Sequence, residues 1–293
     1  MQQNAFGNTG LKVSALGFGA GQIGAESQDE ADVSTILNTV LDCGITLIDT
    51  ARGYGLSEER IGRHLANRRS EFVLSTKVGY GVAGKQDWSY DCIIAGIDEA
   101  LLRMQTDVLD IVHLHSCPLD TLQAYDVIDA LLRVKKEGKI RVAAYSGENA
   151  ELAWAVKSAH FGSVECSVNL FDQASLHAVL PDAAAAGLGV IGKRPLGNAP
   201  WQFADRPIGN YCETYWQRMH ALSLDTLGLP WDEFALRFAA HAPGVSSAIA
   251  GTTSIAHLKH NVEIVGRGAL PAEAIAEITR RYREVGAGWP GEI

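Results

Sequence analysis

Short apolar segments alternate with longer amphipathic segments along almost the whole sequence. The apolar segments have the length and β-branched content of buried strands, and they fall at 16–18, 45–49, 72–77, 108–115, 140–146, 164–169, 188–193 and 245–250. Helical patterns fill most of the gaps, at 57–68, 90–104, 119–136, 149–159, 172–186 and 254–265. Strands that are separated by helices pair in parallel through right-handed crossovers. Eight such units in 293 residues predict an α/β fold, the closed (β/α)8 TIM barrel.

The segments outside this alternation complete the predicted fold. A Gly-Asn-Thr-Gly turn signal predicts an N-terminal β-hairpin within 3–15. Ser27 and Glu30 form a capping box, which predicts that the first helix begins at Ser27. Segment 194–243 interrupts the alternation, so we expect extra helices in the C-terminal third, one of them at 230–241.

The chain shows no sign of a second domain. It has no internal repeat and no low-complexity linker, so the whole of 1–293 is expected to form one barrel domain.

One glycine-rich stretch points to an alternative fold. Residues 19–24 fit the G-x-G-x-x-G fingerprint of dinucleotide-binding doubly wound folds. That fingerprint needs its last glycine inside a helix, but the helix start signal here is Ser27, so a glycine loop above the first strand is the favoured interpretation.

The composition narrows the classes of partner and compartment. The formal net charge is -9 and no basic stripe is present, which argues against a nucleic-acid partner. The five cysteines form no C-x-x-C pair, so we expect free thiols in a reducing compartment. No apolar run is long enough for a membrane span, and no secretory signal is visible at the start. We therefore expect a cytoplasmic protein whose partner is a small molecule.

Four chemically active side chains are predicted at the ends of three consecutive strands. Asp49 ends one strand, Lys77 the next and His115 the third, while Tyr54 lies in the loop after Asp49. The carboxyl ends of barrel strands form one mouth, so these side chains are expected to converge there. His113 shares a face with His115 and is expected to be a hydrogen-bonded core residue. The rival interpretation is a His-x-His metal pair, for which the sequence shows no third ligand.

The residues around Tyr54 resemble a known family. Residues 49–58 read Asp-Thr-Ala-Arg-Gly-Tyr-Gly-Leu-Ser-Glu, and aldo-keto reductases carry D-T-A-x-x-Y-G-x-S-E at this place. The lysine strand, the D-x-x-x-x-H strand and the later cofactor loops are similar in the same order, at 74–77, 107–115, 139–146, 168–170, 195–197 and 249–261. The resemblance extends nearly from end to end. It implies a (β/α)8 barrel that is an NAD(P)-dependent reductase or dehydrogenase.

The resemblance also implies catalytic roles. Hydride delivery to a carbonyl carbon leaves an alkoxide that needs a proton, and Tyr54 is expected to be the general acid/base. A buried ammonium lowers the pKa of a nearby phenol, and a carboxylate keeps the ammonium charged. We therefore expect Lys77 to lower the pKa of Tyr54, with Asp49 as its partner. His115 is expected to hold the carbonyl oxygen by a hydrogen bond.

A nicotinamide cofactor follows from the same resemblance. Ser146 and Asn169 are expected to hold the carboxamide, and Glu165 stands where the family usually has Gln. An ionised carboxylate can accept a hydrogen bond from an amide but cannot donate one, so one contact differs from the family pattern. The other expected cofactor-binding residues come from the first glycine loop and the loops after the last two strands: Gly21, Lys193, Arg194, Pro195, Leu196, Gly251, Thr252, Thr253, Ser254, His257 and Asn261.

The cofactor is expected to be NADP, with NAD possible. The resemblance favours NADP, but Gly251 and His257 stand where many family members hold the 2′-phosphate with Lys and Arg, and this departure leaves NAD open. The expected substrate is a small carbonyl compound or the corresponding alcohol. An alternative is an NAD-dependent sugar or alcohol dehydrogenase that works in the oxidising direction. A more remote alternative is a catalytically idle, NADP-sensing regulatory protein.

Overall fold

Eight parallel strands close into a barrel in a computed structural model that describes all 293 residues. The order around the barrel is β10-β3-β4-β5-β6-β7-β8-β9. The strands are β3 (Leu16–Gly19), β4 (Leu47–Asp49), β5 (Val73–Val78), β6 (Leu109–His115), β7 (Ile140–Ser146), β8 (Ser163–Ser167), β9 (Gly189–Lys193) and β10 (Ser247–Ala250). The predicted barrel is confirmed, and every predicted strand overlaps an observed one. The doubly wound alternative is wrong, because the sheet has no open edge.

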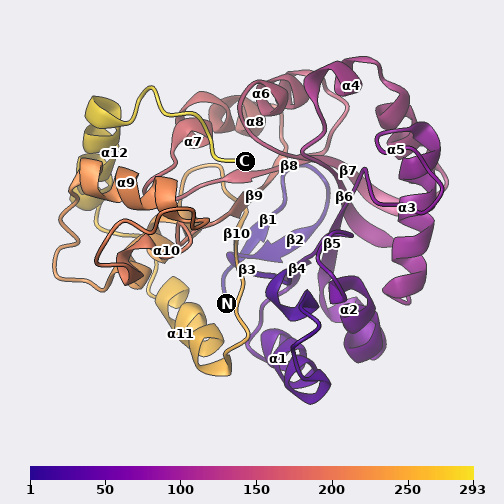
Figure 1. The fold of residues 1–293 in the computed structure, drawn as a ribbon, viewed down its shortest axis with the longest axis horizontal. Helices are drawn as coiled ribbons and strands as arrows, with labels where there is room; N and C mark the ends of the chain where they lie inside the picture. Colours follow the sequence, from indigo (N-terminus) through magenta and orange to yellow (C-terminus); the bar gives the residue numbers. More distant parts are fainter.

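The helices form an outer ring around the barrel, as Figure 1 shows. They are α1 (Glu30–Asp42), α2 (Ser57–Leu65), α3 (Tyr90–Arg103), α4 (Leu119–Gln123), α5 (Asp126–Lys136), α6 (Asn149–Lys157), α7 (Ala174–Ala178), α8 (Leu180–Ala185), α9 (Glu213–Leu222), α10 (Trp231–Ala240), α11 (Ile255–Gly266) and α12 (Ala272–Val285). Short 3-10 turns are η1 (Gln22–Gly24), η2 (Ala66–Glu71) and η3 (Pro200–Gln202). The extra helices expected in the C-terminal third are present. No helix has the length and apolar character that crossing a membrane requires.

The predicted N-terminal hairpin lies across the barrel. β1 (Gln3–Ala5) pairs antiparallel with β2 (Lys12–Ser14), and both lie in the middle of the ring in Figure 1. Apolar side chains of the hairpin form one buried cluster with inward-facing residues of the strands: Phe6, Leu11, Val13, Leu47, Val73, Ile111, Val142, Ala144, Ile191 and Ile249. The hairpin therefore fills the amino-terminal end of the barrel, and the carboxyl ends of the strands are left for polar side chains.

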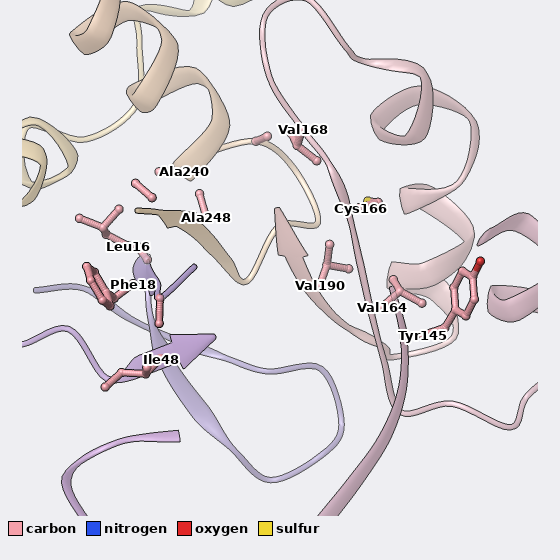
Figure 2. Packing of buried hydrophobic residues seen from close by; sticks show 14 of the residues in the cluster. Leu16, Phe18, Ile48, Tyr145, Val164, Cys166, Val168, Val190, Ala240 and Ala248 are labelled. Carbon is pink, nitrogen blue, oxygen red and sulfur yellow. The ribbon is translucent and has the colours of Figure 1, made fainter. Parts of the chain in front are cut away.

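The outward-facing residues of the strands pack against the helices. Figure 2 shows this layer, with Phe18 and Ile48 on neighbouring strands and Val164, Cys166 and Val190 further round the barrel. They belong to one buried hydrophobic cluster that includes the apolar faces of the helices. Strands buried on both faces carry nearly continuous apolar runs, which is the pattern seen in the sequence. All five cysteines are free, as predicted.

Helix boundaries differ from the predicted ones where local capping decides. α1 begins at Glu30, and its cap is Asp29 rather than Ser27. The carboxylate of Asp29 accepts hydrogen bonds from the backbone N–H groups of Ala31 (2.8 Å) and Asp32 (3.2 Å). Asp is as good an N-cap as Ser, so the helix begins after Asp29 although Ser27 comes first in the sequence.

Two predicted helices are interrupted in the structure. The segment 119–136 contains α4 and α5, because Tyr125 between them is left-handed with φ of 68°. The segment 172–186 contains α7 and α8, which are separated at Val179 immediately before a helix that carries Pro at its start. The C-terminal helix α12 was not predicted.

Candidate active site

The structure brings three of the predicted catalytic residues to the carboxyl ends of neighbouring strands. Asp49 is the last residue of β4, Lys77 lies near the end of β5, and His115 is the last residue of β6. Asp49 follows Leu47 by two residues, so its side chain points into the barrel above the apolar cluster. In register, Lys77 lies beside His113 on β6. The predicted convergence of these strand ends is what the structure shows.

Lys77 lies between two carboxylates inside the barrel. Its Nζ donates to Oδ2 of Asp49, donates to the backbone oxygen of Thr50 at 3.1 Å, and lies 3.3 Å from Oε2 of Glu165. The three side chains are only 1–2% exposed, so water screens these charges very little. Burial alone would lower the pKa of Lys77, but the two carboxylates raise it above its usual value, and the ammonium stays charged.

Asp49 is held by more than its ion pair. Its Oδ1 accepts a hydrogen bond from the hydroxyl of Ser75 at 2.7 Å. Burial, and after it the negative charge of Glu165, raises the pKa of Asp49 to about 6 in spite of Lys77. The carboxylate of Glu165 is therefore an electrostatic neighbour of the catalytic group, which its predicted role as a cofactor contact did not anticipate.

Tyr54 lies in the loop between β4 and α2, close to the ammonium. Nζ of Lys77 is 5.3 Å from the centroid of the Tyr54 ring, and the His115 ring meets it edge-on with centroids 6.0 Å apart. Lys77 lowers the pKa of Tyr54, as expected, but burial and the carboxylates of Asp49 and Glu165 outweigh it and raise the pKa to about 12. The expectation of a lowered pKa is thus wrong, because it left out the burial of the phenol and, after that, counted one acid beside Lys77 where the structure has two.

The glycine-rich stretch at 19–24 supports the Tyr54 loop. The oxygen of Gly24 accepts a hydrogen bond from the N–H of Leu56 at 2.9 Å. A Cβ at Gly24 would lie 1.7 Å from the backbone oxygen of Tyr54, so a larger residue would displace that loop. A Cβ at Gly21 would lie 3.6 Å from the Tyr54 ring, which places this predicted cofactor-binding residue beside the phenol. Close approach of two backbones explains the glycine at position 24.

His115 makes a hydrogen bond with Tyr80, which lies in the loop after β5. The hydroxyl of Tyr80 and Nδ1 of His115 are 2.8 Å apart, and the rings stack with centroids 5.5 Å apart. Burial, and then the charge of Lys77, lowers the pKa of His115 to about 3, so the ring is neutral. Burial raises the pKa of Tyr80, so its phenol keeps the proton and can donate it to Nδ1 of His115.

This hydrogen bond decides which nitrogen of His115 carries hydrogen. A neutral imidazole that accepts at Nδ1 carries its hydrogen on Nε2. His115 can therefore donate to a substrate oxygen from Nε2, as its predicted role requires. The signal that could have revealed Tyr80 is its position three residues after Lys77, in the loop at the end of β5.

His113, Asp49 and Glu165 form a cluster of possible metal ligands. Their potential ligand atoms all lie within 4.8 Å of one another. Asp49 and Glu165 are thus candidate ligands beside His113 that the sequence did not reveal. Lys77 already compensates both carboxylates, and a divalent cation there would face a buried like charge. We therefore describe the cluster as an ion-pair network. His113 is buried as predicted, but neither ring nitrogen has a hydrogen-bond partner, and burial, then Lys77, lowers its pKa to about 3.

An open groove lies along the loops that follow β9 and β10. It has a volume of about 1000 Å³, and Gln22, Trp201 and Asp232 are among the residues that line it. The N-cap of α11 lies here, where the Ser254 hydroxyl accepts from the N–H of His257 at 3.3 Å. The predicted cofactor-binding residues that line the groove are Arg194, Pro195, Leu196, Gly251, Thr252, Thr253, Ser254, His257 and Asn261.

Two basic residues at the end of β9 and directly after it, Lys193 and Arg194, are tied to other parts of the chain. Nζ of Lys193 lies 3.2 Å from a carboxylate oxygen of Glu148, and Lys193 does not line the groove. Arg194 donates to the backbone oxygen of Glu292 at 2.6 Å and to the hydroxyl of Tyr211. The C-terminal tail therefore anchors one wall of the groove.

The residues predicted to hold a nicotinamide carboxamide have unsatisfied atoms. Nδ2 of Asn169 and Oε2 of Glu165 are buried without a hydrogen-bond partner. Ser146 lies beside Glu165 in the register of β7 and β8. An amide oxygen accepts and an amide nitrogen donates, so a carboxamide would satisfy the free donor of Asn169 and could donate to Oε2 of Glu165, which lies 3.3 Å from Nζ of Lys77. These residues fit that group.

Known proteins with similar sequences and structures provide an independent comparison. Residues 15–283 match the model of the Aldo/keto reductase family. The chain is 29% identical to L-galactose dehydrogenase from Arabidopsis thaliana, covering 90% of this chain and 88% of that protein. It is 27% identical to a probable voltage-gated potassium channel subunit beta from Oryza sativa, with 90% of each chain covered. An aldo-keto reductase from Bacillus halodurans in its holo form superposes with a TM-score of 0.83 at 28% identity, covering 98% of this chain and 97% of that chain.

Proposed function

This chain belongs to the aldo/keto reductase family, and we propose that it transfers a hydride between a nicotinamide cofactor, NADP in preference to NAD, and an aldehyde or ketone or the corresponding alcohol. The observation that carries the proposal is Lys77, an ammonium paired with buried Asp49 and 5.3 Å from the centre of the Tyr54 ring. Burying charged groups costs stability unless they are fully paired. Their presence at the barrel mouth therefore favours a catalytic role.

Each catalytic residue has its own task in this proposal. The cofactor supplies or accepts the hydride. Tyr54 has a pKa of about 12, so it is protonated at neutral pH and gives its proton to the substrate oxygen during reduction. Lys77 lowers the free energy of the phenolate that remains. His115 holds the same oxygen through a hydrogen bond from Nε2.

The cofactor-binding residues divide between the mouth and the groove. Ser146, Glu165 and Asn169 would hold the carboxamide, and the N-terminal turn of α11 would receive phosphate oxygens. The groove also contains Asp232, an acid that pairs with His260 at 3.0 Å. An acid close to the groove makes a 2′-phosphate less favourable, which keeps NAD as the alternative cofactor.

Two of the similar proteins favour further candidate functions. Similarity to L-galactose dehydrogenase favours sugars among the possible substrates. Similarity to a probable potassium channel subunit beta favours a regulatory protein that binds the cofactor without useful turnover. The complete set of Asp49, Tyr54, Lys77 and His115 supports the enzyme, because cofactor binding alone would not require all four. Steady-state turnover with aldehydes, ketones and sugars would separate these candidates.

The first test is cofactor binding. The purified protein is titrated with NADPH and with NADH while its tryptophan fluorescence is followed. Trp201 lines the groove, so a bound nucleotide is expected to quench it. We expect saturation by at least one cofactor below millimolar concentration. Failure of both to bind would overturn the proposal.

The second test removes the proposed acid. Tyr54→Phe keeps the ring but removes the hydroxyl, so turnover should fall by roughly 10²–10⁴-fold while cofactor affinity is retained. Tyr125→Phe makes the same chemical change at a residue that is 45% exposed between α4 and α5, and it should leave turnover unchanged. Near-normal turnover of Tyr54→Phe would remove Tyr54 from the mechanism.

A further inference from the structure

We infer that Glu165 makes the reduced cofactor a stronger hydride donor, because its carboxylate gives the barrel mouth an excess negative charge that stabilises the cationic, oxidised nicotinamide ring. This inference rests on the proposed function and gives the site a preferred chemistry, the reduction of carbonyl compounds. It concerns the residue at which this chain departs from the family's usual Gln.

The first observation is that one ammonium serves two buried acids. Lys77 pairs with Asp49 and lies 3.3 Å from Glu165, and these side chains are 1–2% exposed. The ammonium can balance one of the two negative charges. A free lone pair remains on Glu165, whose Oε2 has no hydrogen-bond partner. One formal negative charge is thus left uncompensated at the mouth.

No other group facing the mouth cancels this charge. His113 and His115 on β6 are neutral, since the pKa of each is lowered to about 3. Lys193 on β9 is paired with Glu148 at 3.2 Å, so that pair adds no net charge. At this level the inner face of β3 carries Gly19, that of β7 carries Ser146, and Ser167 follows Glu165 on β8, and none of these residues is charged.

The second observation is the position of the extra charge. Glu165 lies beside Ser146 in the sheet register, and its free oxygen and the free nitrogen of Asn169 fit the carboxamide of a nicotinamide. The carboxylate therefore lies next to the ring system whose charge changes during the reaction. A Gln at this position would make a similar hydrogen bond without the charge.

The charge of Glu165 acts on the hydride transfer, in which atoms and electrons balance. During reduction, the carbonyl carbon gains a hydride, which is one hydrogen nucleus with two electrons, and the carbonyl oxygen gains the proton of Tyr54. The ring that loses the hydride becomes a cation, and Tyr54 becomes a phenolate. Glu165 stabilises the new cation, and Lys77 stabilises the new anion against the negative charges of Asp49 and Glu165.

The expected consequence is a difference in affinity between the two forms of the cofactor. A ligand form that interacts better with the site is bound more tightly, and the bound equilibrium shifts by the same factor. A unit charge in a buried site should change the ratio by at least about tenfold. For a two-electron couple, tenfold tighter binding of the oxidised form lowers the potential of the bound cofactor by about 30 mV.

The test compares the wild type with Glu165→Gln, which has nearly the same shape and restores the family's usual amide. The dissociation constants of the oxidised and reduced cofactor are measured for both proteins by fluorescence titration. We expect the ratio of the reduced to the oxidised constant to fall by at least about tenfold in the variant. The control is Glu273→Gln, the same chemical change at an exposed residue in the first turn of α12, which should leave the ratio unchanged.

Each outcome decides a different question. An unchanged ratio in folded Glu165→Gln would overturn this inference and leave the proposed function standing. If the variant does not fold, the wild-type ratio decides alone, and tighter binding of the reduced form would overturn the inference. If the wild type binds neither form, the proposed function itself fails. A fall in the ratio together with a slower reducing reaction supports the inference.

Discussion

The two ends of the barrel interior are built from the same strands but differ in chemistry. On β4, Leu47 belongs to the apolar layer under the hairpin, and Asp49, two residues later, pairs with Lys77. On β6, Ile111 lies in the apolar layer and His115 at the mouth. A step of two residues keeps a side chain on the inner face, so the change from apolar to charged runs along the barrel axis.

The difference shows how the fold divides stability from chemistry. The apolar layer closes the barrel and contributes stability through burial. The charged layer above it buries an ammonium and two carboxylates, which is costly unless they are paired. Substitutions in the lower layer should therefore change stability with little effect on cofactor binding. Substitutions in the upper layer should change function with little effect on stability.

The largest expected effect comes from the lower layer. Leu47→Ala removes methyl groups from a fully buried side chain of this cluster, and the free energy of unfolding should fall by about 2–5 kcal/mol. Cofactor affinity should stay within about twofold, because Asp49 keeps its backbone position. Chemical denaturation and fluorescence titration measure the two quantities.

The control for this prediction is the same substitution at the surface. Leu102 is 78% exposed, so Leu102→Ala should change the free energy of unfolding by less than about 0.5 kcal/mol. If Leu47→Ala lost cofactor binding while keeping its stability, the division between the two layers would be wrong.

The lower layer and the strands could be predicted from the sequence because they depend on local patterns. Continuous apolar runs between helical segments identified all eight strands, and the five-residue spacing from Asp110 separated His115 from His113. The hairpin was visible through its turn residues. These signals lie within a few residues of the structure that they predict.

The features that could not be predicted depend on contacts across the barrel. Glu165 approaches Lys77 from β8, which is three strands away from β5 around the ring, so no sequence spacing reports their distance of 3.3 Å. The error in the pKa of Tyr54 comes first from the burial of its phenol and then from the acids, of which Glu165 was not anticipated. The break at Tyr125 was missed for another reason, since a left-handed tyrosine carries none of the usual glycine or proline signals.

The next expected effect lies in the upper layer, where Tyr80→Phe removes the donor to Nδ1 of His115. The ring can then adopt either neutral form, so the hydrogen on Nε2 that holds the substrate oxygen is no longer ensured. We expect kcat to fall by about tenfold, the equivalent of one hydrogen bond, with stability and cofactor affinity nearly unchanged. Nitrogen chemical shifts of His115 would report the change of tautomer, which a merely structural role of Tyr80 would not produce.

Tyr90 provides the matched control for that prediction. Its hydroxyl accepts a hydrogen bond from Arg133 of α5 at 3.1 Å and makes none with His115, so Tyr90→Phe should leave kcat and the His115 shifts unchanged. An unaltered His115 spectrum in Tyr80→Phe would mean that another group determines the tautomer.

The smallest expected effect is at the boundary between the two layers, where His113 lies two residues after Ile111 and two before His115. Burial lowers its pKa from 6.5 to about 3, so between these values the folded state binds fewer protons than the unfolded state. Its contribution to stability is therefore complete above pH 6.5 and is lost as the pH falls toward 3. His113→Gln removes this titrating group. Relative to the wild type, the free energy of unfolding of the variant should therefore rise by about 1 kcal/mol for each pH unit below the unfolded pKa. Urea unfolding of both proteins from neutral pH to about pH 5 measures this gain, since about 6.5 is the pKa of an unperturbed histidine. A constant difference between the two proteins would mean that His113 is not held neutral in the folded state, and that the charged layer extends one step deeper into the barrel.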